Sequence, residues 1–319
     1  MFELKIIFIH IFLISSLFTY AQKDSVELQF HQISNEIQYG YKKPKVFDLL
    51  TNIPKNYVDL GKGLTKKNNL AWVGLTIATT AILIPPDQEL LYHAQNISST
   101  VNLSQDHSYG KIVAGMDYPT NVSATFYHFG HGNVSLLFAG GFLATGLIKK
   151  DYRAIHTSIE IGESILTLGV MTQGLKRVFG RQSPNRATVE GGEWNFFPNL
   201  GEYMRNTPNY DAMPSGHMAT LISTVTVISK NYPEVRWIKP LGYSMAALMG
   251  FEMMNSGVHW VSDYPIGFLI GYSVATVSVN RRITKIQTET TSYRQNKIQP
   301  QFFVSSLYGT PVYGVKAVF

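Results

Sequence analysis

Two short clusters, 42 residues apart from histidine to histidine, contain the residues best suited to do chemistry. The first is Pro214-Ser215-Gly216-His217. It predicts the start of a helix with proline at the first helical position, where free backbone N–H groups can hold an oxyanion. A histidine at such a site can donate a proton to a leaving group.

The second cluster is His259-Trp260-Val261-Ser262-Asp263, in which the histidine and the aspartate are four residues apart. On a helix this spacing places both side chains on one face. The carboxylate can accept the proton of one imidazole nitrogen and leave the other nitrogen free to attack phosphorus. Alone, the pair is typical of a helix surface; together with the first cluster it predicts a phosphoryl-transfer site.

A third segment, Lys176-Arg177-Val178-Phe179-Gly180-Arg181-Gln182-Ser183-Pro184, precedes these two. With the two clusters, the second extended to begin at Gly257, it resembles the three-part signature of the type 2 phosphatidic acid phosphatase family. That superfamily also contains bacterial non-specific acid phosphatases and vanadium haloperoxidases. The resemblance spans roughly residues 70 to 280, and the three motifs carry it.

The resemblance implies roles for the matching residues. His259 attacks phosphorus, Asp263 orients it, and His217 protonates the leaving alcohol. Lys176, the Ser215 hydroxyl and the Gly216 amide hold the phosphate.

Two positions depart from the family pattern. Ser183 and Met253 stand where phosphate-binding arginines are expected, and Glu252 precedes Met253. Arginine offers a bidentate fork that serine and methionine lack. Arg181, two residues before Ser183, is therefore predicted to supply the missing charge; a solvated loop cation is the alternative. Glu252 is seven residues before His259, which predicts the same helix face and a pairing with a cation such as Lys176 or Arg181.

The predicted function is metal-independent hydrolysis, without a cofactor, of a phosphate monoester or diphosphate. The substrate is expected to be a phosphorylated lipid or a small phosphate ester. Two alternatives stay open. One is a non-catalytic member that binds a lipid phosphate or a partner, because two arginines are missing. The other is a vanadium-dependent haloperoxidase, against which the same losses count more heavily.

Composition limits the choice of partners. Hydrophobic residues make up 45% of the 319 residues and the mean hydropathy is near zero, between a soluble and a multispan membrane protein. The net charge of +6 suits anionic lipid head groups, and no basic run has the aromatic residues of a nucleic-acid surface. The absence of cysteine excludes disulfides and thiolate sites. A membrane surface is expected as a partner, nucleic acid is not, and the oligomeric state is left open.

The first residues predict export. Residues 1–21 hold a short charged start, an apolar run and a small residue, Ala21, before the expected cut, which is the pattern of a secretory signal peptide. An uncleaved anchor is the alternative. With the family resemblance, this places the protein in a bacterial cell envelope, either periplasmic or membrane-associated with a periplasm-facing site.

The rest of the chain predicts an all-α fold, an antiparallel bundle of about six core helices with a small C-terminal β-hairpin. Residues 22–68 form a polar lead-in segment, 69–285 the phosphatase-like helical domain and 286–319 the hairpin tail. Long apolar stretches without strand-like alternation are expected to form the helices. They are 70–84, 134–148, 157–178, 217–230, 237–256 and 264–280.

Two features of the helices bear on whether they span a membrane. Glu160, Glu163 and Glu252 suit the buried bundle of a periplasmic protein. The glycines at 267 and 271 have the spacing of a close helix–helix contact and favour a membrane, which is the preferred interpretation.

His128 and His131 form a second histidine group, in Tyr127-His128-Phe129-Gly130-His131. They could be metal ligands, but no acidic residue is near them in the sequence. A turn before an apolar helix is the favoured interpretation, with Gly130 as the turn residue.

Overall fold

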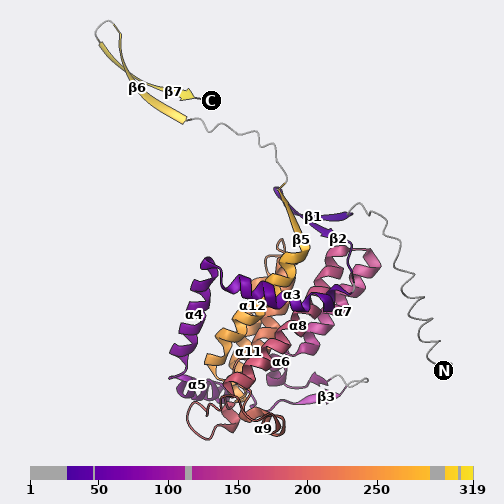
Figure 1. The fold of residues 1–319 in the computed structure, drawn as a ribbon. Helices are drawn as coiled ribbons and strands as arrows, with labels where there is room; N and C mark the ends of the chain where they lie inside the picture. The colour runs from indigo at the N-terminus through magenta and orange to yellow at the C-terminus, as the bar shows by residue number, and fades with distance from the viewer. Residues whose placement is uncertain (1–26, 46, 112–116, 288–298, 308–309, 319) are drawn as a thin grey trace, which may run out of the picture.

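The computed structural model describes residues 27–45, 47–111, 117–287, 299–307 and 310–318. Its body is a helical bundle with a small sheet at one end, and helices α5 and α9 lie at the other end (Figure 1). The predicted signal peptide of residues 1–21 lies outside the described residues.

Six long helices confirm the predicted all-α class, and each overlaps one of the predicted apolar stretches. Their ends differ from the predicted ends by a few residues, because apolar content marks a helix interior better than its caps. They are α4 (Lys67–Leu83), α7 (Gly132–Lys149), α8 (Tyr152–Phe179), α10 (Gly216–Asn231), α11 (Ile238–Asn255) and α12 (Tyr264–Arg282).

Shorter helices, which the sequence analysis did not predict, close the ends of the bundle. They are too polar or too short to show an apolar stretch. They are α2 (Asp48–Thr51), α3 (Ile53–Leu64), α5 (Asp87–Thr100), α6 (Val122–His128), α9 (Leu200–Arg205) and the 3-10 turns η1 (Pro184–Arg186), η2 (Thr207–Asn209) and η3 (Val261–Asp263).

A three-stranded antiparallel sheet caps the end of the bundle away from α5. Strands β1 (Leu28–Ser34) and β2 (Ile37–Lys42) form a hairpin, and β5 (Ile283–Gln287), directly after α12, pairs with β2. This sheet was not predicted, since residues 22–68 were described only as a polar lead-in segment. Tyr41 anchors it, because its buried hydroxyl donates to Asn231 Oδ1 at 3.0 Å.

Two further strand pairs lie outside that sheet. Strands β3 (Tyr109–Lys111) and β4 (Asp117–Pro119) form a short hairpin. Strands β6 (Gln299–Leu307) and β7 (Thr310–Val318) pair antiparallel from Gln299 opposite Val318 to Leu307 opposite Thr310. The predicted C-terminal hairpin is therefore present.

Helix α10 is the centre of the bundle and packs on α7, α8, α11 and α12. Its contact with α12 is close because glycine faces backbone. A Cβ on Gly271 would lie 2.2 Å from the carbonyl oxygen of Ala219, and one on Gly267 would lie 2.5 Å from that of Ser215. This confirms the close contact predicted from the glycine spacing, and it fixes the start of α10 beside the start of α12.

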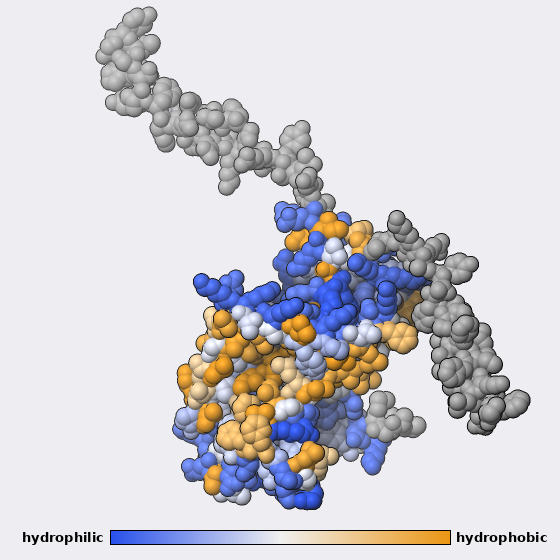
Figure 2. All heavy atoms as spheres, viewed as in Figure 1, coloured by the Kyte–Doolittle hydropathy of each residue, from blue (hydrophilic) through white to orange (hydrophobic). Residues whose placement is uncertain are grey.

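The surface of the bundle carries a wide apolar belt between two polar ends (Figure 2). Trp72 on α4 is 65% exposed, and Ile148 on α7 is 81% exposed. Further exposed apolar residues of the belt are Leu70, Leu75, Ile77, Ile82, Leu136, Leu137, Phe138, Leu143, Leu147, Leu166, Val170, Leu241, Tyr243, Leu248, Phe268 and Tyr272. An apolar surface of this extent marks a site of contact with a membrane or another protein.

Length and composition single out few candidate membrane spans among the described residues. Helix α7 is long and apolar enough to cross a bilayer, and only 17% of that window is buried inside the protein. Helices α4 and α5, bent by 74° at the break between them, would together form a second.

Candidate active site

The start of α10 forms the floor of the site. Helix α10 begins at Gly216 with Ser215 as its N-cap, and the Ser215 Oγ accepts from the Met218 N–H at 3.3 Å. Pro214 therefore lies before the cap, which corrects the prediction that it occupies the first helical position. The N–H groups of the first turn point out of the helix end and carry its positive dipole.

His259 and Asp263 meet at the α11–α12 connection. His259 Nδ1 lies 3.4 Å from Asp263 Oδ2, and both side chains are buried. The Trp260 N–H donates to the same carboxylate oxygen at 2.9 Å. The predicted α-helical face is wrong, because α11 ends at Asn255 and the turn η3 brings the two side chains together.

Arg181 binds the other oxygen of the Asp263 carboxylate. The Nη1 of Arg181 donates to Asp263 Oδ1 at 2.9 Å, and its Nη2 donates to Asp87 Oδ2 at 2.7 Å. The remaining N–H groups donate to Gly191 O and Ser262 Oγ. The guanidinium is fully buried, with its central carbon 4.7 Å from the Trp194 ring centroid.

These contacts correct the role predicted for Arg181. All its N–H groups are used within the protein, so none points to a phosphate bound at α10. The guanidinium instead fixes the carboxylate that orients His259, and it acts on the site through Asp263.

Asp87 is a site residue that the sequence analysis missed. It begins α5, and besides Arg181 it accepts hydrogen bonds from the backbone N–H and hydroxyl of Ser262. It thereby ties α5 to η3. The available signal was an acidic residue directly after Pro85-Pro86, which is typical of a helix start.

Lys176 lies in the last turn of α8 at the site end of the bundle. It is buried, and its Nζ is 3.4 Å from Asp211 Oδ2. Its charge is close enough to His217 to lower the pKa of that imidazole. Lys176 is therefore a cation beside the site, shared with a carboxylate that the sequence analysis did not identify.

The two positions that lack arginine are both buried. Ser183 is 4% exposed and Met253 is fully buried. The Ser215 hydroxyl lies 3.8 Å from Met253 Sδ. A weak sulfur acceptor therefore occupies the place beside the α10 cap where the resemblance would put a cation.

Glu252 was predicted to pair with Lys176 or Arg181, and this prediction is wrong. Its Oε1 lies 3.0 Å from His107 Nε2, and its Oε2 accepts from Asn255 Nδ2 at 3.1 Å. Glu252 is on α11, which ends before His259, so the two do not share a helix face. The carboxylate is satisfied away from the α10 cap.

Histidine and tyrosine rings extend from the site to the start of α7. The His217 ring centroid is 6.1 Å from that of His259, 4.5 Å from that of Tyr127 and 5.3 Å from that of His131. The His131 ring is in turn 4.7 Å from that of His128. His128 ends α6 and His131 caps α7, which agrees with the predicted turn before an apolar helix.

The described residues contain no group of three or more His, Asp or Glu side chains placed to hold a metal ion. His128 and His131 therefore belong to no such group.

The imidazoles of His128, His131 and His217 favour the neutral form. Burial lowers the pKa of His131 to about 4, and the neighbouring His128 and His107 contribute in the same direction. Burial, followed by His259, His131 and Lys176, lowers the pKa of His217 well below its usual value. Burial also lowers the pKa of His128. A phosphate dianion would oppose these effects at His217 and help to protonate it.

Acid is expected to destabilise the folded protein through these three histidines. An unfolded histidine has a pKa of about 6.5, so below that pH the unfolded chain binds more protons than the folded chain. The stabilisation is complete above about pH 6.5 and is lost as the pH falls towards 4, the value for folded His131. Thermal unfolding in detergent at a series of pH values measures the loss.

The matched test replaces His131 by phenylalanine, which keeps a ring but cannot be protonated. The decrease in melting temperature on acidification should be smaller in His131→Phe than in the wild type. His93→Phe is the control, since His93 is exposed on α5. An equal acid response in wild type and His131→Phe would show that His131 is not part of this linkage.

Comparison with known proteins finds a family model that matches part of the chain. The model of the PAP2 superfamily matches residues 158–286, from the first turns of α8 to β5. The match includes all three motifs and confirms the resemblance stated from the sequence. No curated protein matches the chain significantly.

Two solved structures are similar to the chain. LpxE from Aquifex aeolicus is 25% identical over 50% of this chain and 86% of its own, with a TM-score of 0.36. The transmembrane PAP2 type phosphatidylglycerolphosphate phosphatase from Bacillus subtilis is 14% identical over 74% of this chain and 96% of its own, with a TM-score of 0.31.

Proposed function

We propose that this chain, whose residues 158–286 carry the PAP2 superfamily domain, is a phosphatase that acts through a phosphohistidine on a phosphorylated lipid. The observation that carries the proposal is the His259–Asp263 contact of 3.4 Å beside the N-terminus of α10. It combines a nucleophile, its orienting carboxylate and an anion site in one buried place.

In the first step His259 Nε2 attacks phosphorus, and the bond between phosphorus and the leaving oxygen breaks. Asp263 accepts a hydrogen bond from Nδ1–H and stabilises the positive imidazole that forms. His217 donates its proton to the leaving oxygen, which departs as an alcohol. In the second step water attacks phosphorus, gives a proton to His217, and inorganic phosphate leaves with His259 restored.

The phosphate is held by groups at the ends of α10 and α8. The Ser215 side chain and the Gly216 N–H lie at the start of α10, where the helix dipole favours an anion. Lys176 adds a positive charge from the end of α8. This set has fewer cations than the family pattern, so we expect a slow enzyme.

The apolar belt supports a lipid as substrate and a bilayer as the surroundings. Exposed residues such as Trp72, Ile82 and Ile148 would contact acyl chains. The site lies at the end of the bundle that holds α5, because Asp87 of α5 contacts Ser262 of η3 (Figure 1). With export in the orientation expected from the sequence, that end faces the periplasm. Phosphate release from a panel of lipid phosphates, diphosphates and small esters tests the activity.

Turnover is expected to survive a chelator and to be inhibited by orthovanadate. Vanadate resembles the five-coordinate phosphorus that His259 would bind, so it should compete with substrate. Phosphate release with and without chelator, and across a vanadate series, measures both effects. Complete loss in chelator with recovery on adding a divalent ion would contradict the side-chain mechanism.

A non-catalytic phosphate-binding protein is the second candidate. The specific observation in its favour is that Ser183 and Met253 fill the two arginine positions while Arg181 is paired with Asp87 and Asp263. Binding of a lipid phosphate without any phosphate release would support it. A haloperoxidase is disfavoured by the same observation, because a bound vanadate needs those cations, and a peroxide-dependent halogenation assay tests it.

A further inference from the structure

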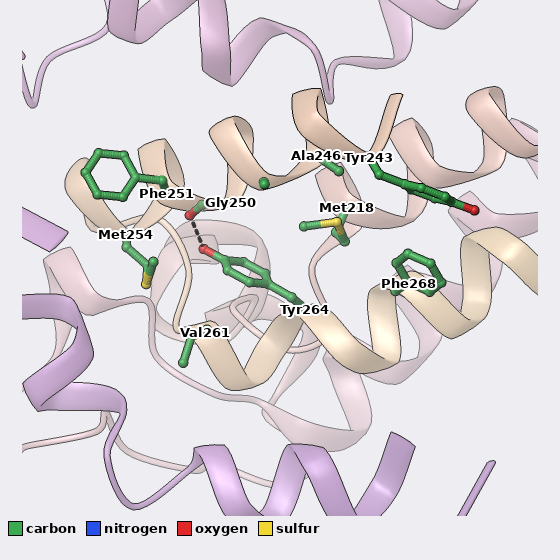
Figure 3. Close-up of a pocket in the computed structure, with 10 residues that line it drawn as sticks. Met218, Tyr243, Ala246, Gly250, Phe251, Met254, Val261, Tyr264 and Phe268 are labelled. Carbon is green, nitrogen blue, oxygen red and sulfur yellow. Dashed lines mark hydrogen bonds between the residues drawn. The ribbon is translucent and has the colours of Figure 1, made fainter. Parts of the chain in front are cut away.

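An apolar groove runs between α11 and α12 next to the candidate active site (Figure 3). Its volume is about 520 Å³, within the range of small-ligand sites. The groove is lined by Met218, Tyr243, Ala246, Ala247, Gly250, Phe251, Met254, Val261, Tyr264 and Phe268.

The sequence of α11 creates this groove. The residues that line it, from Tyr243 to Met254, recur at intervals of three and four and so share one helix face. Small side chains lie in the middle of that face, at Ala246, Ala247 and Gly250. A Cβ on Gly250 would be in ordinary contact with the Tyr264 ring at 3.4 Å. The face is therefore a shallow channel about 16 Å long at 1.5 Å per residue.

Tyr264 lines the groove on the side near His259. Its hydroxyl donates to the Gly250 carbonyl oxygen at 2.7 Å, which fixes the ring across the space between α11 and α12 (Figure 3). The same ring has its centroid 6.4 Å from that of His259. Met218, which also lines the groove, directly follows His217 in α10. The groove therefore lies beside the two histidines.

The other edge of the groove is open to the apolar belt. Tyr243 and Phe268, at the end away from His259, are 38% and 39% exposed, and their rings are 6.0 Å apart. An apolar molecule in contact with the apolar belt could enter the groove between Tyr243 and Phe268 without crossing a polar surface.

We propose that this groove holds a hydrocarbon chain of the substrate lipid while the phosphate lies at His259. The inference rests on the proposed function and adds a determinant of chain preference to it. The lining offers aliphatic, aromatic and thioether surface and no charged group, which suits a methylene chain. The groove opens to the apolar belt and lies beside the two histidines, which favours the substrate over any other apolar ligand.

A helix from a second copy of the chain is too large an occupant. A helix with its side chains is about 10 Å across, so a length of about 16 Å needs roughly twice the volume of the groove or more. A single extended chain has no such difficulty.

The test fills the groove at Ala247, which is exposed on α11. Wild type, Ala247→Leu and Ala247→Trp are purified as full chains in detergent, and kcat/KM is measured for dodecyl phosphate in mixed micelles and for butyl phosphate. The ratio of the two constants is expected to fall in the order wild type, leucine, tryptophan, by about tenfold in Ala247→Trp. Tenfold corresponds to about 1.4 kcal/mol, roughly the contribution of two buried methylene groups.

The matched control is Ala144→Trp, the same change at an exposed position of α7 in the apolar belt. It should leave the ratio as in the wild type. An unchanged ratio in both Ala247 variants, with wild-type turnover of both esters, would overturn the proposal that the groove holds the substrate chain. The proposed phosphatase function would stand. Failure of the wild type to hydrolyse either ester would overturn the proposed function, and the groove inference with it. If Ala247→Trp does not fold, the leucine variant decides.

Discussion

Replacing His259 by alanine is expected to lower kcat by on the order of a hundredfold or more, because it removes the proposed nucleophile that Asp263 orients. The imidazole is buried and held by Asp263, so its loss removes the nucleophile without disturbing a hydrogen-bonded element. Steady-state phosphate release, with a circular dichroism check of folding, measures the effect.

The matched control is His93→Ala, in which the lost imidazole is exposed on α5 and pairs only with Glu89 in the described contacts. Its turnover should remain within a few-fold of the wild type. Activity of His259→Ala within a few-fold of the wild type would end the phosphohistidine mechanism.

Replacing His217 by alanine is also expected to lower turnover, by an amount that depends on the leaving group of the ester. As the proton donor, His217 matters most when the leaving alcohol is a poor one. The loss should therefore be large for an alkyl phosphate and smaller for para-nitrophenyl phosphate, whose leaving group departs without protonation. Equal losses for both esters would indicate that His217 binds phosphate and does not act as the acid.

Replacing Arg181 by alanine is the second change with a large expected effect, and it should act first on stability. The guanidinium is fully buried between Asp87 and Asp263, and its removal leaves two carboxylates buried without their cation. Removing one partner of such a network costs about 3–5 kcal/mol. Thermal or denaturant unfolding in detergent measures the decrease.

Arg205→Ala is the control, because the Arg205–Glu202 pair on α9 is largely exposed and should cost about 1 kcal/mol or less. The outcome also separates two roles for Arg181. A variant Arg181→Ala that keeps wild-type stability and loses only phosphate affinity would support the direct phosphate contact expected from the sequence, against the role in holding Asp263.

The contacts of Arg181 show where inference from the sequence stops. Its distance of two residues from Ser183 suggested that it could reach the phosphate. Its partners come from α5 and from η3, and Asp87 is 94 residues away in the chain. No local pattern connects these segments, and the burial of a charge is decided by which carboxylates the fold places around it.

Much of the rest was determined by the sequence alone. The three motifs indicated a resemblance to the type 2 phosphatidic acid phosphatase family, and the model of the PAP2 superfamily matches residues 158–286, which contain them. The six apolar stretches located the core helices, because an apolar run long enough for a helix needs no information from elsewhere in the chain. The glycines at 267 and 271 predicted a close helix–helix contact of α12, because a helix face without side chains lets a neighbouring backbone come near.

Only the tertiary structure decided the partners of the site residues. It placed His259 beside Asp263 through η3, where an α-helical face had been expected, and it paired Glu252 with His107. It also brought β5 to β2 and so closed the end of the bundle opposite the site. The turn η3 brings His259 and Asp263 together locally, whereas the other contacts join residues far apart in the chain. Their energies come from burial and charge pairing that exist only once the helices are packed.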